Sequence, residues 1–183
     1  MYKDLEKIIL SEDQIAAKVK EAATWLDGKF KDATMPPLAI SVLKGSVYFF
    51  CDVTRAMQIP VQLDFMTVSS YGNSTKSSGI PKIVMDLSAD VQDRDVILIE
   101  DIVDSGYTLQ RMRNLILARG AKSFTVVTLL DKPSRRKLPV KADFSCLEVG
   151  DEFVVGYGLD YAERYRNLSC IGVLKREVYE NEK

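Results

Sequence analysis

The segment that most restricts the fold of this chain is a strand–helix–strand unit between residues 95 and 131. DVILIED, at its start, indicates a buried strand because four apolar residues follow one another without polar alternation. YTLQRMRNLILARG then places Leu109, Met112, Leu115 and Ile116 on one face of a helix. SFTVVTLLD, residues 123–131, indicates a second buried strand. Two such strands joined by a helix predict a parallel pair with a crossover connection.

The same alternation extends over most of the chain and predicts an α/β fold. A capping box formed by Ser11 and Gln14 precedes a helical pattern that ends near Gly28. We expect a mainly parallel central sheet flanked by helices on both faces, within a single domain covering residues 1–183. A second helix is predicted at 47–57, and further strands at 36–43, 61–68, 80–87, 143–150, 152–159 and 170–174.

One segment has a different composition from the rest. SSYGNSTKSSG, residues 69–79, consists almost entirely of small, polar or glycine residues, which is typical of a mobile loop. Because predicted strands precede and follow it, we expect this loop to connect the two strands of a long hairpin.

Composition excludes several classes of function. The chain has a net charge of -1 and a pI of about 5.6, which argues against a nucleic-acid or membrane partner bound mainly by charge. It has no histidine, so catalytic triads and histidine-ligated zinc are excluded. Its three cysteines, without a CxxC pair, predict reduced thiols and a cytoplasmic location. Any catalysis must therefore use carboxylates, lysine, arginine, backbone amides or an oxygen-ligated metal.

Three acidic residues follow the buried strand at 95–101. Glu100, Asp101 and Asp104 are expected at the carboxyl end of that strand, where open α/β sheets bind ligands. Two like charges about 6 Å apart repel by roughly 3 kcal/mol at an effective dielectric constant of 20. A divalent cation, or the hydroxyl groups of a ligand, would relieve this repulsion.

The residues after Asp104 indicate a phosphate site. In DSGYT, the backbone amides lie at the positive end of the following helix, Ser105 and Thr108 add hydroxyl donors, and Gly106 allows a tight turn. The alternative is an ordinary helix cap, although a cap does not require the two preceding acids. The GxxxxGK[ST] pattern is absent. Carboxylates beside a phosphate cradle suggest a phosphorylated sugar as ligand.

At this point the chain resembles a known family. ILIEDIVDSGYT is similar to the phosphoribosyl-pyrophosphate signature of the type I phosphoribosyltransferases. Four other segments resemble the hypoxanthine-guanine phosphoribosyltransferases in order and spacing: LKGSVYFF at 43–50, the 69–79 loop, LLDKPSRR at 129–136 and DEFVVGYGLDYAERYRNL at 151–168. The resemblance covers nearly the whole chain from residue 36 onward.

The resemblance implies the type I phosphoribosyltransferase fold, with a small hood formed by the chain ends and an active-site loop at 69–79. It also implies an activity in purine salvage. Such enzymes transfer ribose 5-phosphate from phosphoribosyl pyrophosphate to N9 of hypoxanthine or guanine, with magnesium, and release IMP or GMP and pyrophosphate. It further implies self-association as a homodimer or homotetramer.

The resemblance assigns sugar and phosphate roles to residues of the signature. Glu100 and Asp101 would hold the ribose hydroxyls and, with magnesium, organise the sugar. Asp104 would face N7 of the purine as a candidate general acid/base. The 5-phosphate would be bound by Asp104, Ser105, Gly106, Tyr107 and Thr108, where the family often has threonine in place of Ser105.

The remaining assignments concern pyrophosphate and base. Lys44 and Gly45 would bind pyrophosphate through backbone groups, across a peptide that is cis in the family, and Arg166 would clamp it. Ser70 and Tyr71 would lie on the closing loop. The purine would contact Lys132 at O6, Phe153 by stacking, and Val154 and Asp160 at the 2-position; Asp160 would also position a magnesium ion.

Without the resemblance, Lys132 indicates a solvated charge and Phe153 a core residue.

Two alternative functions stay open. A regulatory protein could keep the sugar-phosphate site as a sensor, but it would not need Lys132, Phe153, Asp160 and Arg166. It would usually need a nucleic-acid surface or a further domain, and we expect neither here, since the chain has no basic balance. A transferase with another base preference, such as xanthine, is the nearer alternative, since Lys132 excludes adenine better than xanthine.

Overall fold

The computed structural model describes residues 1–69 and 82–180. Its central sheet has the strand order β4-β3-β2-β5-β6-β7. All neighbouring strands are parallel except β3 and β4, which form an antiparallel pair at one edge. The predicted mainly parallel α/β sheet is therefore confirmed. Its strands are β2 (Leu38–Leu43), β3 (Gln62–Ser69), β4 (Lys82–Met85), β5 (Asp95–Val103), β6 (Ser123–Asp131) and β7 (Phe144–Glu148).

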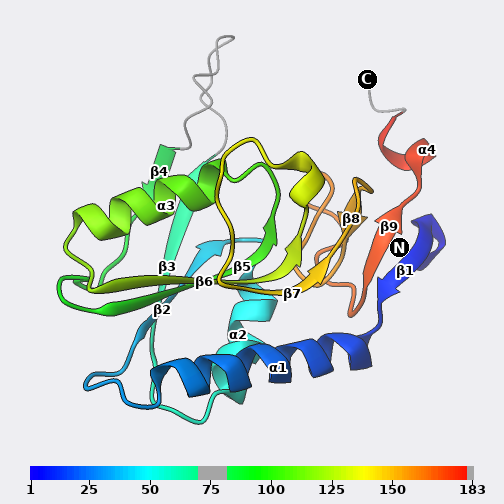
Figure 1. The fold of residues 1–183 in the computed structure, drawn as a ribbon. Coiled ribbons are helices and arrows are strands. Elements are labelled where there is room, and N and C mark those ends of the chain that lie inside the picture. Colours follow the sequence, from blue (N-terminus) through cyan, green and yellow to red (C-terminus); the bar gives the residue numbers. More distant parts are fainter. Residues whose placement is uncertain (70–81, 181–183) are drawn as a thin grey trace.

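Helices cover both faces of this sheet, as predicted (Figure 1). On β5, Ile97 and Ile99 belong to the core shared with α1 (Glu12–Phe30) and α2 (Val47–Ala56). Their neighbours Val96 and Leu98 point to the opposite face and pack with α3 (Tyr107–Ala118). Successive side chains of a strand point to opposite faces. A continuous apolar run is therefore what a strand covered on both sides requires.

The order of the strands reverses between β2 and β5. From β2 the chain passes through α2 to β3, whereas from β5 it passes through α3 to β6 on the other side. β2 and β5 are nevertheless hydrogen-bonded neighbours. In open α/β sheets, the crevice at the carboxyl ends of two such strands is the usual place for a ligand.

The two ends of the chain form a second, smaller sheet beside the first. β1 (Leu5–Leu10), β9 (Ile171–Leu174) and β8 (Val154–Val155) lie in the order β1-β9-β8, and all pairs are antiparallel. Figure 1 shows β1, β9 and the short helix α4 (Arg176–Tyr179) together at one end of the molecule. This sheet is the hood that the resemblance implied.

Several boundaries differ from the prediction. The capping box is confirmed, since the N–H of Gln14 donates to Ser11 Oγ and the N–H of Ser11 donates to Gln14 Oε1. The predicted helix end near Gly28 is confirmed, since α1 ends two residues later at Phe30, whose side chain is buried. Of the predicted strand 152–159 only β8 forms. β1 was not predicted. Ser70, Tyr71 and most of the predicted 69–79 loop lie outside the described residues.

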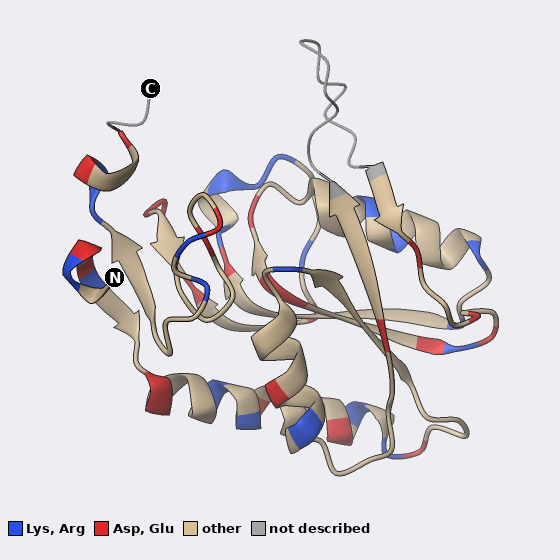
Figure 2. Ribbon diagram, turned by 180° about the vertical axis from the view of Figure 1, so that it is seen from behind, with Lys and Arg blue, Asp and Glu red and all other residues tan. Residues whose placement is uncertain are grey.

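Within residues 1–69 and 82–180, no helix is both long and apolar enough to cross a membrane. Basic and acidic residues are interspersed along α1 (Figure 2). The three cysteines are free thiols: Cys51 is exposed, and Cys146 and Cys170 are buried.

Candidate active site

A cavity of about 270 Å³ lies at the carboxyl ends of β2 and β5. It brings together eight of the residues that the sequence assigned to sugar, phosphate or pyrophosphate: Lys44, Gly45, Glu100, Asp101, Asp104, Ser105, Gly106 and Thr108. Apolar walls come from Val42, Leu43, Val68, Ile102, Val103 and Leu109. Tyr107 does not line the cavity, and its side chain is exposed at the start of α3. The cavity therefore has the position and the donor set of a sugar-phosphate site.

Close backbone approach joins three segments at this cavity. A Cβ built on Gly45 would overlap the carboxylate of Asp101, so the segment after β2 touches the end of β5 only because residue 45 is glycine. On its other side, a Cβ on Gly158 would overlap the carbonyl oxygen of Gly45, and Gly158 has a φ of 104°. The expected cis peptide between Lys44 and Gly45 was wrong: the cis bond is one position earlier, between Leu43 and Lys44 at the end of β2.

Glu100 and Asp101 are adjacent acids at the end of β5 that both line the cavity; Glu100 is buried and Asp101 is partly buried. The Glu100 side chain is buried, its Oε1 has no hydrogen-bond partner, and burial followed by the charge of Asp101 raises its pKa well above the usual range. Burial also raises the pKa of Asp101 to about 6, although the N–H of Ile102 donates to its carboxylate at 2.8 Å. The nearby Asp160 raises the pKa of Asp101 further, and Arg166 lowers it. The positive charge of Arg166 therefore does not offset the burial of Asp101.

The loop from Asp104 to Gly106 leads directly into α3. Gly106 caps the helix in the left-handed conformation, with a φ of 89°, and a Cβ there would lie 2.6 Å from Val140 Cγ2. The carbonyl of Ser105 accepts from the N–H of Lys137 at 2.9 Å, which ties the loop to the segment after β6. The first backbone N–H groups of α3 point back toward this loop, as the start of a helix requires.

Asp104 has two arginine neighbours that the sequence did not reveal. Arg135 Nε lies 3.0 Å from Asp104 Oδ1, and its Nη1 lies 3.0 Å from Asp151 Oδ1. Arg136 donates from Nη1 to the carbonyl of Asp104 at 2.7 Å and also pairs with Asp131. Both arginines belong to the basic segment KPSRRK, whose composition indicated only a loop. Charge alone could not have identified their partners, because these depend on where β6 ends relative to β5.

Three of the four predicted base-binding residues, Lys132, Phe153 and Val154, lie near one another where β6 ends beside the segment that leads into β8. Lys132 directly follows β6, is 6% exposed, and donates from Nζ to the carbonyl of Glu152 at 2.7 Å. Burial lowers the pKa of Lys132. Phe153, the next residue after Glu152, is 38% exposed, and Val154 is buried in β8. Lys132 is therefore not a solvated surface charge, and Phe153 is not a core residue.

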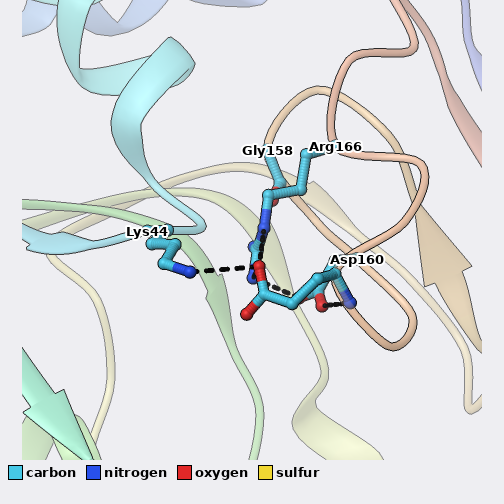
Figure 3. A network of polar contacts seen from close by, with 5 residues as sticks. Lys44, Gly158, Asp160 and Arg166 are labelled. Carbon is cyan, nitrogen blue, oxygen red and sulfur yellow. Dashed lines mark hydrogen bonds and ion pairs between the residues drawn. The ribbon is translucent and has the colours of Figure 1, made fainter.

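The predicted pyrophosphate groups form a network with a carboxylate that the sequence did not single out (Figure 3). Glu163 Oε2 lies 3.1 Å from Lys44 Nζ and 3.3 Å from Arg166 Nη2. Arg166 also pairs with Asp160 at 2.9 Å and donates to the carbonyl of Gly158 at 2.8 Å. The hydrogen bond from Lys44, followed by that from Arg166, lowers the pKa of Glu163. A carboxylate thus occupies the position between the two cations that an anionic ligand would take.

Comparison with known proteins gives one consistent result. The model of the phosphoribosyl transferase domain family matches residues 7–162. The hypoxanthine-guanine phosphoribosyltransferase of Bacillus subtilis is 55% identical over 181 residues, which is 99% of each chain, and that of Streptococcus thermophilus is 45% identical over 98% of each.

Solved structures agree. A hypoxanthine phosphoribosyltransferase from Staphylococcus aureus has a TM-score of 0.92 at 42% identity, covering 99% of this chain and 97% of that one. A mutant hypoxanthine phosphoribosyltransferase from Trypanosoma cruzi, complexed with the product IMP, has a TM-score of 0.93 at 37% identity, covering 100% and 98%. Sequence, fold and site geometry together show that the chain belongs to the phosphoribosyltransferase family and, within it, to the hypoxanthine-guanine phosphoribosyltransferases.

Proposed function

We propose that this protein transfers the 5-phosphoribosyl group from phosphoribosyl pyrophosphate to N9 of hypoxanthine and guanine, and so forms IMP and GMP in purine salvage. The observation that carries the proposal is the cavity at the switch point between β2 and β5. There, a phosphate-type loop, the carboxylates of Glu100 and Asp101 and the Lys44–Gly45 backbone surround one space. A sugar that carries a 5-phosphate and a pyrophosphate needs these three kinds of group at once.

Glu100 and Asp101 would bind the ribose hydroxyls. Hydroxyl donors would satisfy the unpartnered Glu100 Oε1 and would stabilise the charged form of Asp101, whose pKa burial raises to about 6. Asp104 would face N7 of the purine as a general acid/base, and Arg135 would keep its carboxylate beside the base. The loop from Asp104 to Thr108 would hold the 5-phosphate through backbone N–H groups and hydroxyls.

Magnesium is the proposed cofactor, and the residues present suit it. Mg²⁺ in such sites binds one or two carboxylates together with substrate phosphates and water. Glu100 and Asp101 offer such a pair, and Asp160 lies near enough to influence the pKa of Asp101. Within residues 1–69 and 82–180 there is no cluster of three or more acidic or thiol ligands, so substrate oxygens would have to complete the coordination. When bound, the ion would supply positive charge to the departing pyrophosphate.

Pyrophosphate would take the place of the Glu163 carboxylate. Lys44 and Arg166 both contact Glu163 in the structure, and a pyrophosphate offers more negative charge to the same two cations. The N–H groups of the Lys44–Gly45 segment would add donors without a side chain in the way. The proposed closing loop with Ser70 and Tyr71, outside the described residues, would exclude water from the cationic sugar during transfer.

Lys132 would select the base. One of its three protons is used by the carbonyl of Glu152, which leaves donors for O6 of a 6-oxopurine. Adenine carries an amino group at that position, so donor would face donor. Phe153 would stack on the purine, and Val154 and Asp160 would read its 2-position. Xanthine also has the O6 carbonyl, so it is the competing base to test.

Two further features complete the proposal. The three free thiols are compatible with a cytoplasmic location, where thiols stay reduced. The family resemblance supports self-association as a homodimer or homotetramer, which light scattering of the purified protein would measure.

The proposal predicts turnover of 6-oxopurines only. Purified protein with phosphoribosyl pyrophosphate and Mg²⁺ should convert hypoxanthine and guanine to nucleotides, with adenine slower by about 10⁴-fold, because the adenine amino group leaves buried donors unpaired. Xanthine in the same assay establishes the ranking at the 2-position. Binding of phosphoribosyl pyrophosphate without turnover of any base would refute the enzyme and favour a sensor.

Replacement of Lys132 tests base selection directly. Lys132→Met keeps most of the aliphatic stem but removes the donor, so kcat/KM for hypoxanthine should fall by about a hundredfold or more, and the preference over adenine should shrink. Lys141→Met, at an exposed lysine of the same loop region, is the matched control and should keep both values. Equal effects of the two substitutions would remove Lys132 from the base site.

We expect Asp101→Asn to lower transferase activity and to raise the free energy of unfolding. A pKa raised from 3.8 to about 6 means that the charged Asp101 destabilises the free protein by about 3 kcal/mol above pH 6. The folded state binds the Asp101 proton more tightly than the unfolded state does. Protonation of Asp101 therefore stabilises the folded protein below about pH 4, and this stabilisation is lost as pH rises through 6.

Urea unfolding of Asp101→Asn should therefore give a larger free energy of unfolding than wild type at pH 8 and no gain at pH 4, together with reduced transferase activity. Asp32→Asn, at an exposed aspartate, should change neither quantity. A variant that is less stable than wild type at pH 8 would contradict the proposed charge imbalance.

A further inference from the structure

The last described residues of the chain reach the proposed base site. Tyr179, at the end of α4, lies nearly parallel to the ring of Phe153, with ring centroids 5.1 Å apart and an angle of 25° between the planes. Tyr161 meets both rings edge-on, at 5.7 Å from Phe153 and 6.3 Å from Tyr179. Three aromatic side chains from three separate segments therefore form one cluster around Phe153.

Backbone contacts hold this cluster in place. The N–H of Leu174 in β9 donates to the carbonyl of Phe153 at 2.8 Å. The next residue, Lys175, donates to the carbonyl of Asp4 at 3.0 Å, and α4 begins immediately after it. Val178 and Tyr179 pack against the hood core that contains Leu5 and Leu174. Tyr179 is thus placed over Phe153 by the same strand that fixes the Phe153 backbone.

The place of Phe153 in the chain does not by itself fix the orientation of its ring. The side chain is 38% exposed, and the residue immediately precedes the short strand β8. Tyr179 covers one face of the ring and Tyr161 meets its edge. Lys132, the proposed O6 donor, is hydrogen-bonded to the carbonyl of Glu152, the residue before Phe153. A tilt of the Phe153 ring would therefore move a stacked purine out of line with that donor.

We propose that Tyr179 is a positioning residue for the base: it forms the outer layer of a Tyr179–Phe153–purine stack and sets the plane of Phe153. The inference rests on the proposed function, in which Phe153 stacks on the purine. If Tyr179 instead covered the face of Phe153 that the purine needs, the Tyr179 ring would compete with the base. Removal of the ring would then lower KM for the base instead of raising it.

The test compares Tyr179→Leu with Tyr179→Phe. Leucine keeps an apolar side chain in the hood but removes the ring, whereas phenylalanine keeps the ring. KM for hypoxanthine should rise about two- to tenfold in Tyr179→Leu and stay near the wild-type value in Tyr179→Phe, because an aromatic pair of this kind is worth a factor of that size. KM for phosphoribosyl pyrophosphate should stay within about twofold in both.

Tyr2→Ala, at an exposed tyrosine near the other chain end, is the matched control and should leave both KM values unchanged. An unchanged or lowered KM for hypoxanthine in Tyr179→Leu would overturn the inference, as would equal rises in the two KM values or failure of Tyr179→Phe to restore binding. If wild type and Tyr2→Ala show no turnover at all, the proposed function fails as well; if they turn over normally, only the role of Tyr179 is refuted.

Discussion

The site depends on one close contact, between the backbone at Gly45 and the carboxylate of Asp101. β2 and β5 are neighbours at the point where the strand order reverses, so their carboxyl ends open into a common crevice. Any side chain at residue 45 would overlap Asp101, and any side chain at Gly158 would overlap the carbonyl of Gly45. Three distant segments can therefore converge because glycine at 45 leaves room for the Asp101 carboxylate and glycine at 158 leaves room for the Gly45 backbone.

The charges around this contact are unbalanced in a way that suits a sugar diphosphate. The two acids at the end of β5 stand on one side, with the pKa of Glu100 raised well above its usual range and that of Asp101 raised to about 6. On the other side Lys44 and Arg166 share the exposed carboxylate of Glu163, and Arg166 also pairs with Asp160. Hydroxyls or a cation would satisfy the acids, and the phosphate groups of a ligand would replace the carboxylates at the two cations. Burying the unpartnered oxygen of Glu100 costs folding free energy, and such costs are common at functional sites.

Local patterns predicted much of this structure, and long-range contacts account for what they missed. The strand 123–131 is found with both predicted ends, because uninterrupted apolar residues and flanking polar ones define it locally. The turn from Glu100 to Thr108 could also be predicted, because its acids and its small residues are contiguous in the sequence. In contrast, β1 was not predicted. Its charged residues interrupt the apolar pattern of a strand, and it forms by pairing with β9, more than 160 residues away. Arg135, Glu163 and Tyr179 each contact a residue that only the fold brings near, namely Asp104, Lys44 and Phe153.

Affinity for phosphoribosyl pyrophosphate, measured by titration calorimetry with Mg²⁺, tests the central contact most directly when Gly45→Ala is compared with Gly28→Ala. A Cβ at Gly45 would strike Asp101, whereas one at Gly28, inside α1, meets nothing within 4 Å. We predict that Gly45→Ala weakens binding by about a hundredfold or more. Asp101 or the backbone at residue 45 must shift to make room for the methyl group, and such a shift misplaces the groups of the site. Gly28→Ala should bind as wild type does. Equal affinity of the two folded variants would contradict a site built on the contact between β2 and β5.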